Sequence, residues 1–379
     1  MASNTNLNAV RRDIYLGIKE QSREVTGFIQ AVNTSTGAEV ASKHDVVKIP
    51  YGTAGKMIDT PVGFAFPDAA DSDVGSLQMT LDFSKTVPID WDGEQEKVII
   101  NAGIETTVLG MQFADAIRQI TNAIEKTVAD EIVKHSSRAY GTAGITPFAD
   151  GSKMTDMAQM KGILDKNGAP RTNRTIVLSS EAETSLLSNQ TNFIKVNEAG
   201  SDQMIRQGII MPTYGFNVRS SFGIEEFQAS TFSGATVNGT ADVGATEIAI
   251  TGATGSLKAG DVVTFGDAKE KYVVEDYFAT KITINKGLIK PVAKNAAIAV
   301  GGNYTPSFAM TKGAVALAVR PPKAPKDGDM MERAYVTDPI SGITYEIARV
   351  KGQRIIQYQV SALWGVKVVN PEHVATLLG

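Results

Sequence analysis

The sequence has no cysteine among its 379 residues. Disulfides, thiolate metal ligands and cysteine nucleophiles are therefore all excluded. Long apolar runs are also lacking, because the longest of them, such as Gly313–Val319, fall far short of the roughly 18 residues that a membrane span requires. Nor do the first residues contain the apolar core of a signal peptide. We expect a soluble chain that is not exported and has no membrane partner.

The sequence also lacks a large excess of positive or negative residues. The 37 Lys and Arg residues are balanced by 41 Asp and Glu residues, which leaves a net charge of −4. Such a chain has no overall basic surface for gripping nucleic acid, and the Arg11–Arg12 pair is only a small basic spot. Glycine, in contrast, is plentiful, and its 35 residues predict many turns.

The residue combinations that carry catalysis are absent. His44, His135 and His373 stand far apart in the sequence, and none belongs to a paired zinc motif. The sequence also has no G-x-S-x-G nucleophile elbow and no G-x-G-x-x-G run after a strand. We therefore predict that the protein is not an enzyme, with no catalytic residue and no cofactor.

Tyr51–Met57 (YGTAGKM) faintly resembles a phosphate-binding loop. That motif needs a glycine where Pro50 stands and a serine or threonine where Met57 stands, so we reject it.

Asp71 and Asp73 have the spacing of a calcium loop, with Asp82 at the twelfth position. However, Gly75 replaces the fifth-position ligand and Ser76 replaces the sixth-position glycine, so a solvated acidic turn is the better interpretation. The sequence predicts no metal site.

The strongest periodic signal lies between Glu105 and His135. Apolar residues recur there every three or four positions with no proline in between, which predicts one very long amphipathic helix. The apolar stripe consists of Leu109, Phe113, Ile117, Ile120, Ile124, Val128 and Ile132. We interpret it as core packing, and His135 falls near the helix end, where a cation suits the helix dipole.

The remaining segments alternate between strand and helix patterns. Val46 to Trp91 is an extended stretch rich in turn residues, which predicts a mobile lid or a protruding hairpin. A helix ending at Gly168, a buried strand in RTIVLSS and a helix capped by the preceding serine follow. The segment YGFNVRSSF reads as another strand, and two long strands and a short tail close the chain.

A run of short strands and turns interrupts this pattern from Gly234 to Gly302, here called the β-rich block. Strands are predicted at residues 247–250, 262–265, 272–275, 282–284 and 297–300, which suggests a small barrel or sandwich. Gly234 and Gly301–Gly302 are expected to be flexible joints, as where one domain is inserted in another. We predict an autonomous structural module that binds no substrate.

The order of these parts resembles the major capsid protein fold of tailed phages, the Hong Kong 97-like fold. The C-terminal ALWGVKVVNPEHVATL looks like the end of coat proteins from short-tailed phages, and TEIAITGATGSLKAGDVVTFGDAK looks like their β-barrel insertion domain. The segments YGFNVRSSF and PSFAMTKGAVALAVRP resemble the strands that flank that insertion. The resemblance covers nearly the whole chain, through weak motifs in a fairly specific order.

The resemblance implies an α+β fold with an N-terminal arm, an extended loop, a long spine helix, peripheral and axial domains and an inserted β-barrel. The implied division is an arm at residues 1–44, an extended loop at 45–92, a peripheral domain at 93–140 and 345–379, an axial domain at 141–231 and 303–344, and the insertion at 232–302. The insertion looks compact, without the long extra loop that some relatives use at two-fold contacts.

The resemblance also implies the partners. A coat protein assembles with itself into hexamers and pentamers of an icosahedral shell, which encloses double-stranded DNA without reading its sequence. A portal protein is a further implied partner, and the short arm implies a separate scaffolding protein rather than a fused one. The protein would be found in the virion, after assembly in the cytoplasm of the bacterial host.

Two other functions stay open at the level of sequence. A protein nanocompartment descended from capsids would share the fold class, although the inserted barrel argues against it. A polysaccharide-binding or hydrolysing β-protein would need exposed aromatic rows or a carboxylate pair, and aromatic residues make up only 7% of the chain.

Overall fold

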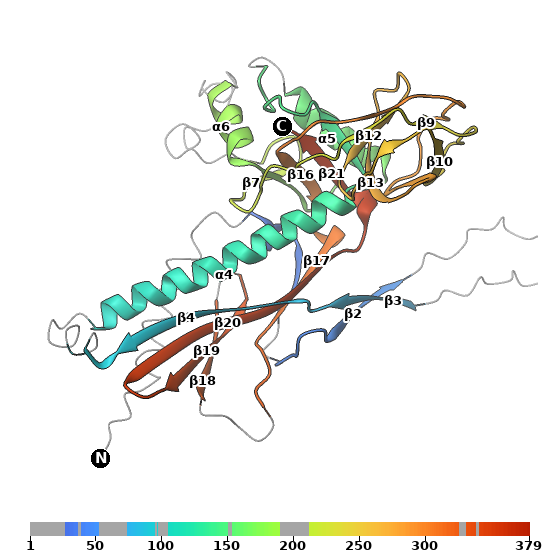
Figure 1. The fold of residues 1–379 in the computed structure, drawn as a ribbon. Helices are drawn as coiled ribbons and strands as arrows, with labels where there is room; N and C mark the ends of the chain where they lie inside the picture. Colours follow the sequence, from blue (N-terminus) through green and yellow to red (C-terminus); the bar gives the residue numbers. More distant parts are fainter. Residues whose placement is uncertain are drawn as a thin grey trace, which may run out of the picture.

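The structure is a computed structural model. It describes residues 27–36, 39–52, 74–94, 97, 105–150, 154–189, 212–325, 331–338 and 341–379. A long helix, α4 (Glu105–His135), runs diagonally across the molecule between two β-sheets (Figure 1). The predicted α+β class is confirmed. Residues 1–26 of the N-terminal arm, implied at residues 1–44, lie outside the described residues.

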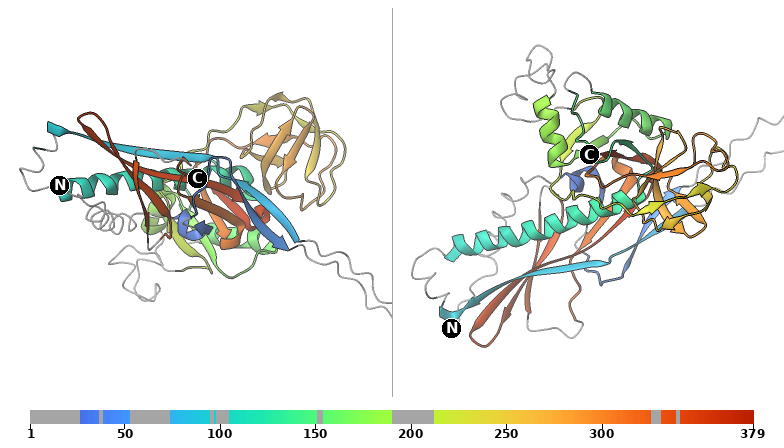
Figure 2. Two further views of the ribbon diagram at one scale, coloured as in Figure 1. Left: turned by 90° about the horizontal axis from the view of Figure 1, so that it is seen from below. Right: turned by 45° about the horizontal axis from the view of Figure 1, so that its top comes forward.

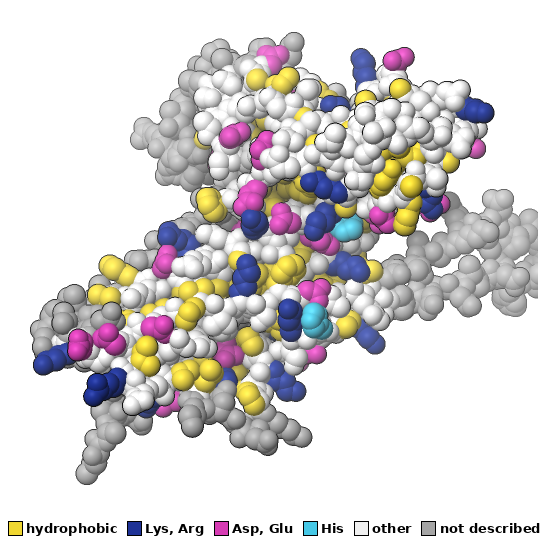
Figure 3. Space-filling view, in the orientation of Figure 1, with side chains coloured by type: hydrophobic (Ala, Val, Ile, Leu, Met, Phe, Trp, Pro, Cys, Tyr) yellow, Lys and Arg dark blue, Asp and Glu magenta, His cyan; other side chains and the backbone are white. Residues whose placement is uncertain are grey.

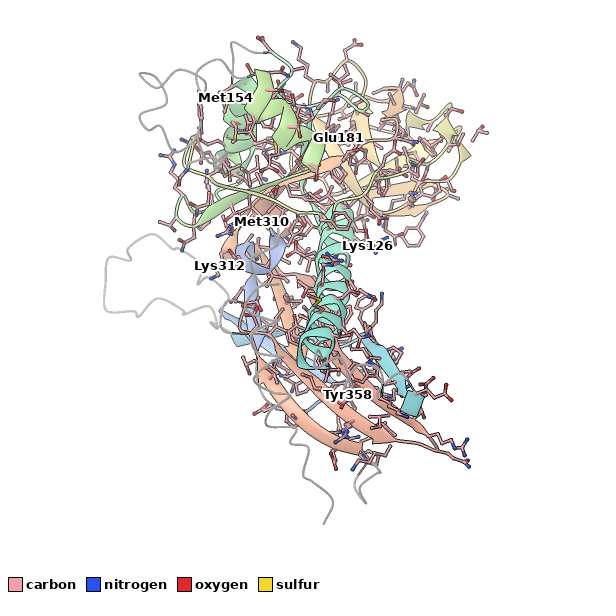
Figure 4. The ribbon with its side chains drawn as sticks, turned by 90° about the vertical axis from the view of Figure 1, so that its left-hand side faces the viewer. Lys126, Met154, Glu181, Met310, Lys312 and Tyr358 are labelled. Atoms are coloured by element: carbon pink, nitrogen blue, oxygen red, sulfur yellow. The ribbon has the colours of Figure 1, made fainter. Side chains whose placement is uncertain are left out.

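Helix α4 has the bounds that its apolar stripe predicted. The stripe residues from Leu109 to Ile132 are all at least 96% buried. Phe113 packs edge-on against Tyr358, with ring centroids 5.6 Å apart, and Figure 4 shows Tyr358 on the sheet beneath the helix. The Thr121 hydroxyl lies 3.0 Å from that of Tyr345 on the same sheet. The stripe is therefore core, as predicted.

The sheet under α4 is built around β20 (Ile355–Val368), the longest strand. It pairs antiparallel with β4 (Phe83–Asp92), β19 (Thr344–Lys351) and β17 (Val315–Arg320). The outer members are β18 (Met331–Thr337), on β19, and β1 (Asn33–Thr36), parallel to β17. The two long strands predicted near the C-terminus are thus confirmed as β19 and β20.

The second sheet lies at the C-terminal end of α4. Its strand order is β7-β6-β16-β21-β5-β13-β14-β10-β9, with β12 on β13 and β15 on β12. The strands outside the β-rich block are β5 (Arg138–Gly141), β6 (Arg174–Leu178), β7 (Asn217–Ser220), β16 (Pro306–Thr311) and β21 (Val374–Leu378). The predictions of a buried strand at β6 and a strand at β7 are confirmed.

Helices α5 (Thr155–Lys166) and α6 (Ser180–Asn189) accompany this sheet. Gly168, with φ +76°, follows α5 in the left-handed conformation that ends helices. The Ala182 N–H donates to Ser179 Oγ at 3.2 Å, so a serine caps α6, but it is Ser179 and not Ser180, the serine directly before EAETSLLS. Short elements complete the fold: α2 (Phe28–Ala31), η1 (Lys312–Ala314), η2 (Pro371–His373), β8 (Phe232–Ser233) and β11 (Thr254–Gly255).

The β-rich block contains the five strands that the sequence predicted. They are β10 (Glu247–Thr251), β12 (Val262–Phe265), β13 (Lys271–Phe278), β14 (Lys281–Ile284) and β15 (Ile298–Val300), and the short strand β9 (Thr236–Val237) was not predicted. They enclose an apolar cluster of their own. The block is nonetheless continuous with the second sheet, because β13 pairs with β5 through Lys271↔Ala139 and Tyr272↔Arg138.

The glycines expected to be joints of the block contact other residues of the block. The Gly301 N–H donates to the Val262 carbonyl at 2.8 Å, which ties this joint to β12. Gly234, with φ +74°, is a turn residue facing Gly252. The Gly301 hydrogen bond lies within the block, so the expectation of flexible joints at Gly234 and Gly301–Gly302 stays a prediction.

Candidate functional site: a projecting hairpin and two joints of the long helix

A two-stranded hairpin projects from the body near the C-terminal end of α4. Strands β2 (Val46–Gly52) and β3 (Val74–Thr80) pair antiparallel from Val46↔Thr80 to Gly52↔Val74. Figure 1 and both views of Figure 2 show the pair leaving the body on the same end as the β-rich block. The sequence predicted either a mobile lid or a protruding hairpin here, and the structure contains a protruding hairpin.

The root of the hairpin is anchored on the first sheet. Met79 and Leu81 are buried in an apolar cluster with Ala316, Ala318 and Leu363. A β-carbon at Gly365 of β20 would lie 2.2 Å from the Thr80 carbonyl oxygen, so the crossing requires glycine at that position. The hairpin is therefore fixed at its base by close backbone contact.

Further along, the described part of the hairpin is only partly covered: Val47 and Ile49 pack against the same cluster, and the other face is open. Val46, Lys48 and Gln78 are exposed, and Ile49 and Leu77 are only half-buried. A two-stranded hairpin is at best marginally stable in water without another surface to cover one face. The arm thus has the form of a segment that gains stability from contact with another molecule.

His44 and Asp82 meet at the hairpin root. His44 Nδ1 lies 3.1 Å from Asp82 Oδ1, and the Thr80 hydroxyl donates to Asp82 Oδ2 at 2.6 Å. The Thr80 hydrogen bond, with help from His44, holds the pKa of Asp82 below its ordinary value. Both side chains are largely exposed, so they form a surface turn contact. Asp71 and Asp73 of the rejected calcium loop lie outside the described residues.

The first joint of α4, the Glu125 joint, fixes α2 to the helix. The Glu125 carboxylate accepts the Ile29 N–H at 2.8 Å and the Phe28 N–H at 3.0 Å. The Ser221 hydroxyl donates to the same carboxylate at 2.5 Å. One acidic side chain thereby ties α2 and the turn after β7 to the middle of α4. Lys126, the next residue along the helix, is labelled in Figure 4.

Glu125 is buried, with 2% of its surface exposed. Burial raises the pKa of its carboxyl above the ordinary value, while the Ser221 hydroxyl and the backbone N–H groups of Phe28 and Ile29 oppose the rise. Two glycines allow the close packing. A β-carbon at Gly27 would lie 2.5 Å from the Ser220 carbonyl oxygen, and one at Gly223 would lie 2.7 Å from the α4 backbone.

The second joint of α4, the Asn285 joint, lies where the helix ends. Asn285, just after β14 of the β-rich block, donates its Nδ2 hydrogens to the Lys134 and Ser136 carbonyl oxygens, each at 3.0 Å. The last carbonyls of a helix lack partners within the helix, so a side-chain amide satisfies them. His135 lies 3.4 Å from Glu131 beside this joint. The block therefore caps α4 as well as extending the second sheet.

The other candidate residues from the sequence do not come together in one site. His373 lies in η2, and burial lowers its pKa. Arg11, Arg12 and most of Tyr51–Met57 lie outside the described residues. Within the described ranges, no group of three or more His, Asp or Glu side chains could hold a metal ion, and no helix could cross a membrane.

The described surface carries both charges, interspersed. Figure 3 shows Lys and Arg side chains alternating with Asp and Glu over the face of α4 and the second sheet. Several large apolar side chains are also exposed, among them Phe222 at 72% and Met111 at 68%. Single exposed apolar residues are ordinary on a protein surface.

Sequence reasoning missed the Glu125 joint. The signal was nevertheless present, because Glu125 falls in phase with the stripe between Ile124 and Val128. A charged residue on the buried side of a helix needs hydrogen-bond partners. Its partners are 96 and 97 residues away in sequence, so no local pattern could identify them.

No protein-family model matches the sequence, and neither does any curated protein. Solved structures similar to this chain include the mature capsid of bacteriophage PhiM1, at 12% identity and a TM-score of 0.48 over 93% of this chain and 87% of that one. The capsid of the cyanophage P-SCSP1u is 10% identical, with a TM-score of 0.47 over 93% and 88% of the two chains. A virus-like particle from Pyrococcus furiosus is 8% identical, with a TM-score of 0.44 over 98% of both chains.

Proposed function

We propose that this chain is the structural subunit of a capsid shell. Copies of it would form the hexamers and pentamers of an icosahedral shell that encloses the double-stranded DNA of a tailed phage. A separate scaffolding protein would guide assembly in the host cytoplasm, and a portal protein would belong to the same virion. The protein has no catalytic step in this proposal, and it needs no cofactor.

The projecting hairpin is the observation that carries the proposal. Its root is locked to the first sheet at Gly365, and its exposed strands leave the body. A two-stranded hairpin that its own fold leaves half-uncovered gains stability when another surface covers it. In a shell a neighbouring copy provides that surface, because the contacts are made between repeated copies of one surface.

The surface chemistry supports the same proposal. Charges of both signs are interspersed on the surface, and the net charge is −4. The subunit therefore has no extended positive potential that would bind the enclosed DNA tightly. The exposed apolar residues are scattered rather than gathered in one groove, which suits many small contacts.

The domain division implied by the family resemblance remains part of the proposal. Within its extended loop, residues 45–92, the projecting part is β2 and β3, whereas β4 pairs along β20. The insertion at 232–302 would brace the subunit through the Asn285 joint and the β13–β5 pairing.

Expression of the full-length chain, with and without the proteins encoded next to its gene, tests the proposal. We expect closed particles of megadalton mass by electron microscopy and mass photometry when a scaffolding protein is present. Monomers or dimers under every condition would contradict it. The contents of the particles separate the two kinds of shell: nuclease-protected DNA supports a phage capsid, and an enclosed enzyme supports a capsid-derived nanocompartment.

A further inference from the structure

The sequence contains the dipeptide Asn-Gly twice, at Asn167–Gly168 and at Asn238–Gly239. In this dipeptide the backbone nitrogen of the glycine can attack the side-chain amide of the asparagine, because glycine has no β-carbon to obstruct the approach. Asn167 is 8% exposed, whereas Asn238 lies on the surface. The same pair of residues therefore occurs once in a closed environment and once in an open one.

The side chain of Asn167 is held by three hydrogen bonds. Its Nδ2 donates to Ser137 Oγ at 3.0 Å and to the Glu372 carbonyl oxygen at 2.7 Å. Its Oδ1 accepts a hydrogen bond from Arg138 Nη2 at 2.8 Å. The amide group can therefore react only after it has left these partners.

The backbone at Asn167 is equally unsuited to the reaction. Asn167 follows α5 with ψ −4°, which places the Gly168 nitrogen beside the residue's own nitrogen and away from its side chain. The Gly168 N–H also donates to the Asp165 carbonyl oxygen at 3.1 Å. Both reacting groups of this dipeptide are thus occupied.

Asn238 has none of these restraints. It directly follows β9, the strand at the outer end of the second sheet (Figure 1). Its backbone N–H donates to the Ala249 carbonyl oxygen at 2.8 Å, but within the described ranges its side chain and the Gly239 N–H make no hydrogen bond. A β-carbon at Gly239, where φ is +101°, would meet nothing within 4 Å. The glycine nitrogen therefore has open space beside it.

We propose that Asn238 is a site of spontaneous deamidation in the folded protein, whereas Asn167 is protected. A base in solution takes the proton from the Gly239 nitrogen, which then forms a bond to Asn238 Cγ. The bond from Cγ to Nδ2 breaks, and Nδ2 takes up a proton and leaves as ammonia. Water opens the resulting cyclic imide at Cγ to give an aspartyl residue, or at the backbone carbonyl carbon to give an isoaspartyl residue.

Either product changes the β-rich block locally. A new carboxylate adds one negative charge to a chain whose net charge is −4. The isoaspartyl product also lengthens the backbone between Asn238 and Gly239. This insertion lies after the hydrogen bond from Asn238 to Ala249 and before the one from the Ala241 N–H to the Val292 carbonyl oxygen, at 3.0 Å. We expect the block to keep its fold and to loosen only around Ala241.

The proposal is tested on the full-length chain, folded and incubated at mildly alkaline pH. Peptide mapping by mass spectrometry follows both asparagines over time, with chromatographic separation of aspartyl and isoaspartyl peptides. We expect Asn238 to be lost at least about tenfold faster than Asn167, since each hydrogen bond that protects Asn167 and Gly168 should slow ring closure about two- to tenfold. The same chain unfolded in guanidinium chloride is the matched control, in which both dipeptides should react at similar rates.

Asn238→Gln keeps an amide at this position but moves it one methylene further from the backbone, which disfavours ring closure. In this variant we expect the acidic species to disappear from isoelectric focusing of aged samples, while Asn167 stays intact.

Equal loss of Asn167 and Asn238 from the folded chain would overturn the proposal. So would an Asn238 that stays intact when folded but reacts when unfolded, or an unfolded chain in which neither dipeptide reacts. These comparisons use the wild-type chain, so they hold even if Asn238→Gln fails to fold. The site goes beyond the capsid function, and because particle formation is not measured, its failure is distinct from failure of the capsid proposal.

Discussion

The hairpin β2–β3 and the β-rich block are built from the same materials, short strands and glycine-rich turns, yet they are held in different ways. The block encloses its own apolar cluster, in which Val263 and Ile282 are fully buried. The hairpin encloses no cluster of its own among its described residues; Met79 and Leu81 at its root are buried against Ala316, Ala318 and Leu363 of the first sheet, next to the crossing at Gly365. The difference teaches that strand pairing alone does not make a β-segment independent, because burial of apolar surface provides most of the stability.

The largest effect is expected from a charge placed inside the block. Val263→Asp would bury an unpaired carboxylate at a fully buried position, at a cost of about 3–5 kcal/mol in the free energy of unfolding. Thermal unfolding followed by circular dichroism measures the loss. The control is Val243→Asp, which lies in the same block with 62% of the side chain exposed. Similar melting of both variants would mean that the block has no core of its own.

The hairpin should respond most to a change at its root. Gly365→Ala puts a β-carbon 2.2 Å from the Thr80 carbonyl oxygen, which forces the hairpin off β20. Overpacking of this kind costs about 1–3 kcal/mol, and limited proteolysis should cut β2 and β3 sooner. Gly313→Ala is the matched control, because nothing lies within 4 Å of a β-carbon there. If both variants resist proteolysis like the wild type, the crossing does not anchor the arm.

Substitutions of Asn285 test how far the β-rich block depends on its contact with the end of α4. Asn285→Ala removes two hydrogen bonds to the end of α4, each contributing about 0.5–1.5 kcal/mol. We expect a lower free energy of unfolding in urea at every pH, since no ionisable group is involved. Asn285→Asp would add a negative charge at the negative end of the helix dipole and should be worse than alanine. An unchanged unfolding midpoint in both would show that β13–β5 pairing alone holds the block.

A charge reversal on the arm should separate stability from assembly. Lys48 is exposed on β2 opposite Gln78, so Lys48→Glu should change the free energy of unfolding by no more than about 0.5 kcal/mol. Particle yield should nevertheless fall if the arm lies against another copy. Lys269→Glu, exposed in the block, gives the comparison. A greater loss of particles from Lys269→Glu would indicate that the β-rich block, rather than the hairpin, makes the main contact between subunits.

The smallest effect concerns pH at the hairpin root. The pKa of Asp82 lies below its ordinary value of 3.8 because the Thr80 hydroxyl and His44 favour the carboxylate. The contribution is present above that value and is lost as pH falls through the lowered pKa. Because Asp82 is largely exposed, it amounts to a few tenths of a kcal/mol at about 25 °C. Proteolysis of the arm between pH 5 and pH 3 should show it, and Asp82→Asn should remove it.

Local patterns in the sequence determined the elements. The unbroken apolar spacing from Leu109 to Ile132 predicted α4 because a helix repeats every 3.6 residues. Alternation in EIAIT and KITI predicted β10 and β14 because a strand repeats every two. A serine cap on α6 depends on neighbouring atoms, and the sequence predicted it to within one residue. Each of these signals acts over a few residues, so the sequence contains it in full.

The tertiary structure decided which surfaces meet. No local rule brings Ser221 to Glu125, sets β13 beside β5, or lays Thr80 across Gly365. These contacts join residues from 96 to 285 positions apart, and many alternative pairings have the same local pattern. What selects among them is the packing of whole faces, in which buried polar groups must find partners and backbone crossings must find space.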